Sequence, residues 1–359
     1  MAARVQKVVP AAPDEAVIRE AASILVAGGL VAFPTETVYG LGADALDARA
    51  VARIFEAKGR PADNPIIVHL ADAAMLSDVV ASVPARARLL IARCWPGPLT
   101  LVLPASPAVP KVTRGGLPTV AVRVPAHRVA IALIRAAGRP IAAPSANRSG
   151  RPSPTTAQHV LADLGDAIDL VLDAGPTPLG VESTVLDLTR RVPTVLRPGG
   201  VPLETLQDIL GRVSVADPRR TGAAVLRPSP GMRYRHYAPR ADMYLVEGPH
   251  DRVGADVAAA VRSLWGQGLR VGVMVTAETA PAVPTGAVVR VMGRRDDPAT
   301  IAARLFAQLR ELDDAGLDAI VVEGIAERGL GRAVMDRLRR AAGLTNRESH
   351  QGATRHKPG

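Results

Sequence analysis

The pattern of hydrophobic and polar residues predicts alternating helices and strands over the N-terminal part of the chain. Ile18, Ala22 and Leu25 recur at helical spacing within residues 14–27. Short apolar runs bounded by Pro, Gly or Asp predict buried strands. The predicted helices are 14–27, 48–58, 84–93, 127–137 and 155–164, and the predicted strands are 30–34, 66–70, 99–104, 119–124, 141–143, 170–173 and 183–188. Because the predicted helices and strands are interspersed along the chain, the pattern indicates an α/β fold. It does not separate parallel from antiparallel strand neighbours.

Residues 213–240 interrupt this pattern, because they are rich in proline and arginine and show little periodicity. We interpret them as an extended linker. After the linker, strand-like and helix-like segments alternate more cleanly, which predicts a smaller, doubly wound parallel domain. The predicted strands there are 243–247, 271–275, 288–292 and 319–323, and the predicted helices are 254–265, 299–314 and 331–342. The expected organisation is a first domain at 1–212, the linker at 213–240, a second domain at 241–343 and a disordered basic tail at 344–359.

Composition narrows the class of protein. Hydrophobic residues make up 48% of the 359 residues, enough for two buried cores. No apolar run approaches the length of a membrane span, and the N-terminus has no apolar signal-peptide core. Cys94 is the only cysteine, which excludes an internal disulfide and a cysteine-based zinc cluster. These features predict a soluble cytoplasmic protein.

The net charge of +10 is concentrated in two segments. Residues 212–240 hold seven arginines against one acid, and residues 332–359 hold seven basic residues against two acids. Such stretches attract phosphate groups, either of a nucleotide or of RNA. They are equally typical of solvated, flexible segments in an arginine-rich protein, and the sequence leaves both interpretations open.

Familiar catalytic signatures do not occur in this sequence. No lysine is followed by Ser or Thr, so there is no P-loop, and neither GxGxxG after a strand nor GxSxG nor HExxH is present. Instead, polar segments punctuated by Gly and Pro adjoin the predicted strands, where ligands bind in open α/β sheets. These segments are PTETVYGLG (34–42), KGRPADNPIIVH (58–69), TVAVRVP (119–125), PSANRSGRPSPT (144–155) and GVESTVLDLT (180–189), the last followed by LRPGG (196–200).

Basic residues in these segments are the candidates for chemistry. Lys58 and Arg60 follow a predicted helix on a turn stiffened by proline, which suits a polyphosphate. A solvated helix end is the alternative. Arg123 interrupts an apolar strand and, if buried, needs an anionic partner, either a substrate carboxylate or an internal acid. His69 lies among apolar neighbours, where a hydrogen-bonded core histidine is the alternative to a functional one.

The ordered set PTETVYGLG, KGRPADNP, PSANRSG, GVESTV and LRPG closely resembles the YrdC-like family of L-threonylcarbamoyladenylate synthases. SPGMRYRHYAP at 229–239 resembles the linker of the long, two-domain Sua-type form. The resemblance implies a twisted, mixed-sheet YrdC-like domain around a basic cavity, followed by a smaller Rossmann-like domain. It implies a nucleotidyltransferase that converts L-threonine, bicarbonate and ATP to threonylcarbamoyl-AMP and pyrophosphate.

The resemblance also implies roles for individual residues. Lys58 and Arg60 would hold the ATP phosphates and act in catalysis. Further ATP contacts would come from Asn64, Thr119, Ser145, Asn147, Ser153, Arg197, His236 and Tyr237. L-Threonine would be bound by Thr37, His69, Arg123, Ala143 and Ser183. No metal ligand is assigned in the protein, although Mg²⁺ is expected to accompany ATP, and the linker would close over the nucleotide through His236 and Tyr237.

The same resemblance implies partners and leaves two alternatives. The product would supply a tRNA threonylcarbamoyl transferase for the N6-threonylcarbamoyladenosine (t6A37) modification of tRNA. A non-catalytic RNA-binding protein would explain the basic charge, but aromatic residues are only 3% and no RNA-binding motif occurs. A carbamoyl-transfer maturation factor contains a related domain, but it also carries cysteine zinc fingers, and this chain has one cysteine.

Overall fold

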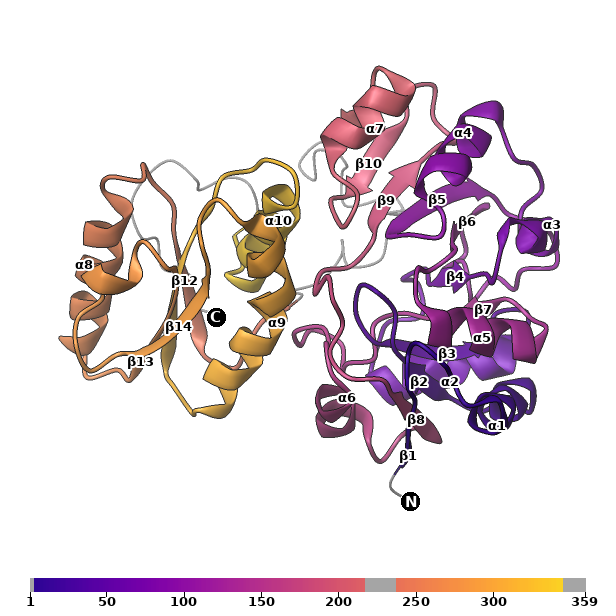
Figure 1. Cartoon of the computed structure of the whole chain (residues 1–359), viewed down its shortest axis with the longest axis horizontal. Coiled ribbons are helices and arrows are strands. Elements are labelled where there is room, and N and C mark those ends of the chain that lie inside the picture. The colour runs from indigo at the N-terminus through magenta and orange to yellow at the C-terminus, as the bar shows by residue number, and fades with distance from the viewer. Residues whose placement is uncertain (1–2, 217–236, 345–359) are drawn as a thin grey trace. The chain divides into compact units, whose positions relative to one another are not determined.

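The computed structural model describes residues 3–216 and 237–344 and divides the chain into two compact units (Figure 1). The first unit comprises Met1–Ser149 and Ser153–Arg233, and the second comprises Gly150–Pro152 and Tyr234–Gly359. The α/β class predicted from the sequence is confirmed: the first unit contains a large mixed sheet and the second a separate parallel sheet. The exact domain boundaries at 212 and 240 stay a prediction. Of the disordered tail expected at 344–359, residues 345–359 lie outside the described residues.

Within its described residues, the first unit is built on an 11-stranded sheet in which parallel and antiparallel pairs alternate irregularly. In spatial order its strands are β1 (Arg4–Lys7), β8 (Leu170–Asp173), β2 (Val31–Phe33), β3 (Gly40–Asp44), β7 (Ile141–Ala142), β4 (Ile67–His69), β6 (Thr119–Arg123), β5 (Leu99–Pro104), β9 (Thr184–Asp187), β10 (Thr194–Arg197) and β11 (Ser214–Val215). Its helices are α1 (Glu15–Val26), α2 (Ala48–Lys58), α3 (Leu76–Val79), α4 (Ala85–Cys94), α5 (Arg128–Ala137), α6 (Ala157–Leu164) and α7 (Leu203–Leu210), with a 3-10 turn η1 (Ala73–Met75).

Hydrophobic residues cover both faces of this sheet. In β2, Val31 and Phe33 belong to the core cluster that contains α1 and α5, whereas Ala32 belongs to the larger cluster on the other face. Successive side chains of a strand point to opposite faces, so a continuous apolar run is what a strand covered on both sides requires. This explains why the buried strands appear in the sequence as short apolar runs without alternation.

Polar residues set where the helices begin and end. The Asp14 side chain caps α1 by accepting hydrogen bonds from the backbone N–H groups of Ala16 and Val17. The α2 helix ends at Lys58 because Gly59 adopts a left-handed conformation, with φ of 58°. The chain turns at this glycine, which places Arg60 on the turn that follows the helix.

The second unit is a doubly wound parallel sheet, as the sequence predicts. Its strand order is β12 (Asp242–Val246), β15 (Ala319–Glu323), β13 (Val271–Thr276) and β14 (Val288–Gly293). Its helices are α8 (Val253–Trp265), α9 (Pro298–Asp314) and α10 (Gly331–Ala341), with a 3-10 turn η2 (Ala280–Ala282). Figure 1 shows α8 on one face of this sheet and α9 with α10 on the other. No helix among the described residues is long and apolar enough to cross a membrane.

Candidate functional site

The ends of two parallel strands bring the first candidate residues together. His69 ends β4, Arg123 ends β6, and the two are direct partners in the register of this strand pair. Because parallel neighbours end at the same edge of a sheet, the two side chains lie side by side. Both are buried, with exposed fractions of 4% for His69 and 2% for Arg123.

The PTETVYGLG segment supplies the immediate partners of Arg123. The Thr37 hydroxyl accepts a hydrogen bond of 3.1 Å from Arg123 Nη1 and lies 2.7 Å from the Thr35 hydroxyl. Glu36 Oε2 lies 2.5 Å from Arg123 Nη2, an ion pair whose angle does not meet hydrogen-bond geometry. The internal acid that the sequence left open as a partner of Arg123 is therefore present, and Thr37 lies beside the same guanidinium.

His69 is held in its neutral form. Burial, and secondarily the positive charge of Arg123, lowers the pKa of His69 to about 3. The ring also contacts Phe33 edge-on, with ring centroids 6.2 Å apart. A neutral imidazole beside a buried cation is suited to positioning a ligand rather than to carrying charge.

Ser183 and Arg197 form a second group of candidate residues. Arg197 ends β10, and its Nη2 donates to the Ser183 carbonyl oxygen at 3.0 Å. The Ser183 hydroxyl lies 2.7 Å from the Thr100 hydroxyl in β5. A Cβ at Gly199 would lie 2.3 Å from the Ser183 carbonyl carbon, so the LRPGG turn can approach this strand only with glycine there.

Lys58 connects the end of α2 to the PSANRSG loop. Its Nζ donates to the carbonyl oxygen of Ser145 at 2.5 Å and to that of Asn147. The Ser145 hydroxyl in turn donates to Asn147 Oδ1 at 2.6 Å. Burial, and secondarily the charge of Arg60, lowers the pKa of Lys58 well below its usual value. With exposed fractions of 3% for Lys58 and 8% for Arg60, the alternative of a solvated helix end is wrong.

Arg60, Asn64 and Thr119 lie toward the other end of the β4 and β6 strand pair. Arg60 Nη2 donates to the Pro65 carbonyl at 3.1 Å, just before β4 begins. Thr119 begins β6, and four residues of extended strand separate it from Arg123, about 13 Å. Along this strand pair, Thr119, which is expected to contact ATP, is thus separated from His69 and Arg123, which are expected to contact threonine.

The remaining candidates in the first unit have defined partners. The Ser153 hydroxyl donates to Glu182 Oε1 at 2.6 Å, and both residues are buried. The Ala143 N–H donates to the Ile67 carbonyl at 2.9 Å, which fixes the chain between β7 and β4. Neither contact by itself reveals a ligand role for Ser153 or Ala143.

Several buried polar atoms at this site lack hydrogen-bond partners within the described part of the chain. They include Glu36 Oε1, Asn64 Oδ1 and Arg123 Nε. Folded proteins leave few buried polar atoms unsatisfied, since each costs free energy. Atoms of this kind can accept or donate a hydrogen bond to a ligand, which makes Glu36, Asn64 and Arg123 candidates for ligand contact.

Of the two linker residues expected to contact ATP, one lies in the described part of the chain. His236 lies outside the described residues. Tyr237 belongs to the second unit, where its ring packs against Phe306 at a centroid distance of 5.3 Å and lies 5.5 Å from the Arg337 guanidinium carbon. Its φ of 65° is left-handed, which is unusual for a residue with a side chain. Closure of the linker over a nucleotide stays a prediction.

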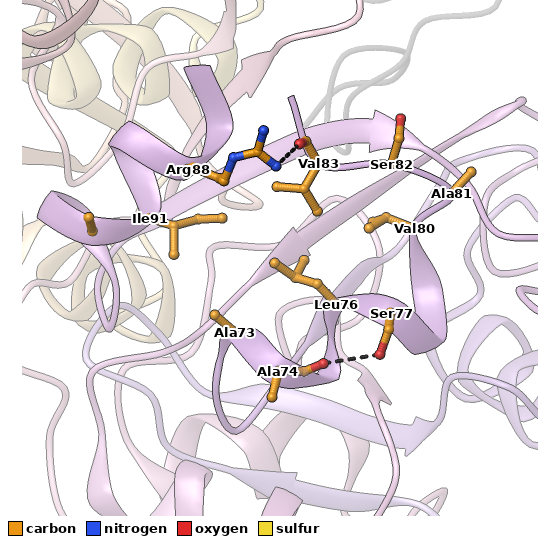
Figure 2. A pocket seen from close by; sticks show the side chains of 11 residues that line it. Ala73, Ala74, Leu76, Ser77, Val80, Ala81, Ser82, Val83, Arg88 and Ile91 are labelled. Carbon is orange, nitrogen blue, oxygen red and sulfur yellow. Dashed lines mark hydrogen bonds between the residues drawn. The ribbon is translucent and has the colours of Figure 1, made fainter. Parts of the chain in front are cut away.

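A surface hollow of about 640 Å³ lies elsewhere in the first unit, between the α3 region and α4 (Figure 2). Its lining is mostly Ala, Val, Leu and Ile, with Ser77, Ser82 and Arg88 as the polar exceptions. None of the candidate site residues lines it. A single arginine among apolar side chains does not suit a triphosphate, so the hollow is not the candidate site.

Comparison with known proteins decides the family. Residues 201–343 match the family model described as the C-terminal domain of threonylcarbamoyl-AMP synthase, and residues 23–199 match a model described as telomere recombination. A threonylcarbamoyl-AMP synthase of Pyrococcus abyssi is 50% identical over 92% of this chain and 95% of that protein. The chain belongs to the threonylcarbamoyl-AMP synthase family. The resemblance noted in the sequence is therefore confirmed.

Further comparisons support this family assignment. The threonylcarbamoyl-AMP synthase of Bacillus subtilis is 47% identical over 91% of this chain and 93% of its own length. The crystal structure of P. abyssi Sua5 complexed with L-threonine matches with a TM-score of 0.90 and 48% identity, covering 95% of this chain and 98% of that one. The predicted pairing of a mixed-sheet YrdC-like domain with a Rossmann-like domain is thus confirmed for this family member.

Three residues at the site receive no role in the sequence analysis: Glu36, Thr100 and Glu182. Glu36 and Glu182 stand inside the recognised motifs, but nothing local shows that their carboxylates are buried beside Arg123 and Ser153. Thr100 lies in an apolar strand 83 residues from Ser183, and only the pairing of β5 with β9 brings the two hydroxyls together.

Proposed function

We propose that this chain synthesises threonylcarbamoyl-AMP from L-threonine, bicarbonate and ATP, with pyrophosphate as the second product. The family relationship supports this reaction. The structural observation that carries it is the burial of four cations, Lys58, Arg60, Arg123 and Arg197, at strand and helix ends of one unit. Buried cations require anionic partners, and the substrates supply phosphates and carboxylates.

The triphosphate is assigned to Lys58, Arg60 and Arg197. Lys58 has two of its three N–H donors on loop carbonyls, and its lowered pKa would return toward the usual value beside an anion. Arg60 and Arg197 offer planar guanidinium groups, which match phosphate oxygens. Asn64, Thr119, Ser145, Asn147, Ser153, His236 and Tyr237 are proposed as further nucleotide contacts.

L-Threonine is assigned to the region around Arg123. A guanidinium can bind the substrate carboxylate in two parallel hydrogen bonds. Thr37 presents a hydroxyl there, and neutral His69 adds a group that can hydrogen-bond without charge. Ser183 is a further proposed contact of the amino acid. Ala143 is the remaining proposed lining position.

The chemistry needs alignment and charge neutralisation rather than a covalent nucleophile. The neutral threonine amine adds to CO2 formed from bicarbonate and loses a proton, which leaves an N-carboxylate. An oxygen of this group attacks the α-phosphorus of ATP, and the bond to the β-phosphate oxygen breaks to release pyrophosphate. Fixed cations stabilise the charge that develops on the phosphates.

Mg²⁺ is proposed to enter with ATP. Residues 3–216 and 237–344 hold no group of three or more His, Cys, Asp or Glu side chains arranged for a metal. Mg²⁺ commonly takes most of its ligands from substrate phosphates and water. The ion would neutralise charge on the departing pyrophosphate.

The chemistry of the product indicates which kind of partner enzyme would consume it. A carboxylate joined to AMP is an activated mixed anhydride, so a transferase that acts on tRNA is proposed to consume it promptly. A cytoplasmic location, where ATP and tRNA are available, belongs to the same proposal. The non-catalytic RNA-binding alternative receives no support from the relatives described above, which are named as synthases.

The test is pyrophosphate release by the pure protein with ATP and bicarbonate. Release should require L-threonine and fall sharply with serine or valine in its place. Lys58→Glu and Arg60→Glu should each lower the rate by about 100-fold or more, since they reverse charges facing the phosphates. Arg49→Glu, an exposed position on the same helix, is the matched control and should retain the rate. Synthesis at full speed in the Lys58→Glu and Arg60→Glu double variant would refute the proposal.

A further inference from the structure

The carboxylate of Glu36 is buried, and it has no part in the ATP and L-threonine contacts proposed above. Its exposed fraction is 9%, and its Oε2 lies 2.5 Å from Arg123 Nη2. Within residues 3–216 and 237–344, neither carboxylate oxygen has a hydrogen bond of acceptable geometry. A buried carboxylate loses its hydration, and one cation at a poor hydrogen-bond angle does not offset that cost.

Hydrogen bonds fix the backbone around Glu36, so its side chain cannot readily move out into water. The Glu36 carbonyl accepts a hydrogen bond from Leu179 N–H, and the Thr37 carbonyl accepts one from Gly180 N–H. The Thr35 hydroxyl donates to the Val38 carbonyl at 2.7 Å, which closes the turn. The carboxylate is therefore held at the edge of the site, where one of its oxygens can accept a hydrogen bond from a ligand.

We propose that Glu36 binds the α-amino group of the amino-acid substrate while Arg123 binds its carboxylate. This inference rests on the proposed function, which places the amino acid at Arg123. An α-amino acid carries its amine and its carboxylate on one carbon, and the adjacent Arg123 and Glu36 present the complementary pair of charges.

The consequence for the reaction is orientation of the nucleophile. The amine nitrogen must face CO2 before it can be carboxylated, and an acceptor that holds one N–H fixes the direction of the nitrogen lone pair. Glu36 also selects substrates that have an amine. A hydroxy acid of the same shape offers one donor and no positive charge, so it gains less from the carboxylate.

The experiment compares L-threonine with dihydroxybutanoate, in which a hydroxyl replaces the amine. Binding of each to the full chain is measured by calorimetry in wild type and in Glu36→Gln. The variant should bind threonine about tenfold or more weakly, since a charge-assisted hydrogen bond is lost. Its affinity for dihydroxybutanoate should stay within about twofold of wild type.

Asp44→Asn is the matched control. Asp44 is a buried acid in the same unit, 4% exposed, whose Oδ2 lies 3.1 Å from Arg139 outside the candidate site. This variant should preserve the ratio of the two affinities. Thermal melting identifies any variant that fails to fold, and if Glu36→Gln does so, Glu36→Asp is used and should lower the same ratio.

Two results would overturn the proposal. If Glu36→Gln weakens both ligands equally, Glu36 only orients Arg123, and if it weakens neither, the carboxylate does not touch the substrate. Arg123→Met separates this outcome from failure of the proposed function. It should abolish threonine binding if the amino acid lies at Arg123, whatever the role of Glu36.

Discussion

At the scale of single residues, the site is a set of ionisable side chains that the fold keeps out of water. Lys58, His69 and Arg123 are each at least 96% buried, and their environment shifts two of them away from their ordinary protonation. Lys58 loses affinity for its proton because it is buried near Arg60, and His69 because it is buried near Arg123. Such shifts make folding stability depend on pH.

We expect His69 to make the first unit less stable in acid. Its pKa is about 3 in the folded protein, against an ordinary value of 6.5. Between these values the unfolded chain binds more protons, so stability falls as pH falls, by up to about 1.4 kcal/mol per pH unit. Above pH 6.5 neither state binds the proton and the contribution is constant.

His69→Gln cannot titrate, so its unfolding free energy should fall less steeply than that of wild type from about pH 6.5 to pH 4. Urea unfolding at several pH values measures this, with Trp95 as the reporter of the first unit in a Trp265→Phe background. His250→Gln, at an exposed position of the second unit, is the control. Parallel pH profiles for wild type and His69→Gln would show that burial does not perturb this histidine.

At the scale of elements, α1 and α5 pack together on one face of the large sheet. Ile18 and Leu25 of α1 and Leu133 and Ile134 of α5 belong to one buried cluster. Each helix has an apolar stripe that faces the sheet and its neighbour, which is what the periodicity in the sequence predicts.

Leu133→Ala should destabilise the first unit by about 2–5 kcal/mol, because it removes a side chain with no exposed surface and leaves a cavity. Leu89→Ala, at a position 50% exposed on α4, should cost at most about 0.5 kcal/mol. The Trp95 unfolding transition measures both changes. Equal effects at the two positions would contradict the assignment of Leu133 to the core.

Short elements were the least predictable from the sequence. The hydrophobic pattern does not predict the strands at Gly40–Asp44 (β3) and Thr194–Arg197 (β10) or the helix at Leu203–Leu210 (α7). Residues 40–44 form a strand because β2 and β7 pair with them on either side. Gly42 lacks strand propensity, but a Cβ there would lie 2.8 Å from the Phe33 ring. Tertiary packing therefore overrides local preference at this point.

At the scale of the whole molecule, the second unit has its own core and its own buried charge network. Glu323, at the end of β15, has no exposed surface. Its carboxylate accepts hydrogen bonds from the Thr276 N–H at 2.7 Å and from Arg295 Nη2 at 3.0 Å. The network joins the ends of two parallel strands to the segment after β14, so it belongs to the stability of this unit.

Glu323→Gln should lower the stability of the second unit by about 3 kcal/mol or more, because it leaves the Arg295 charge without its partner. Trp265 fluorescence in a Trp95→Phe background reports this unit. Asp296→Asn is the control and should change stability by less than about 0.5 kcal/mol, since Asp296 and Arg294 are both at least 70% exposed. If the Trp95 transition moves as far as the Trp265 transition, the two units do not unfold independently.

The sequence by itself determined the α/β class, most long helices and strands, and which motifs contain the candidate site. These features are encoded locally, because an apolar stripe or run shows within a few residues which side of an element is buried. Tertiary structure alone decided that Glu36 lies against Arg123, that Thr100 supports Ser183 and that Lys58 holds the loop at Ser145. Those contacts depend on which strands become neighbours, and strand pairing is settled by packing of the whole sheet rather than by any one segment.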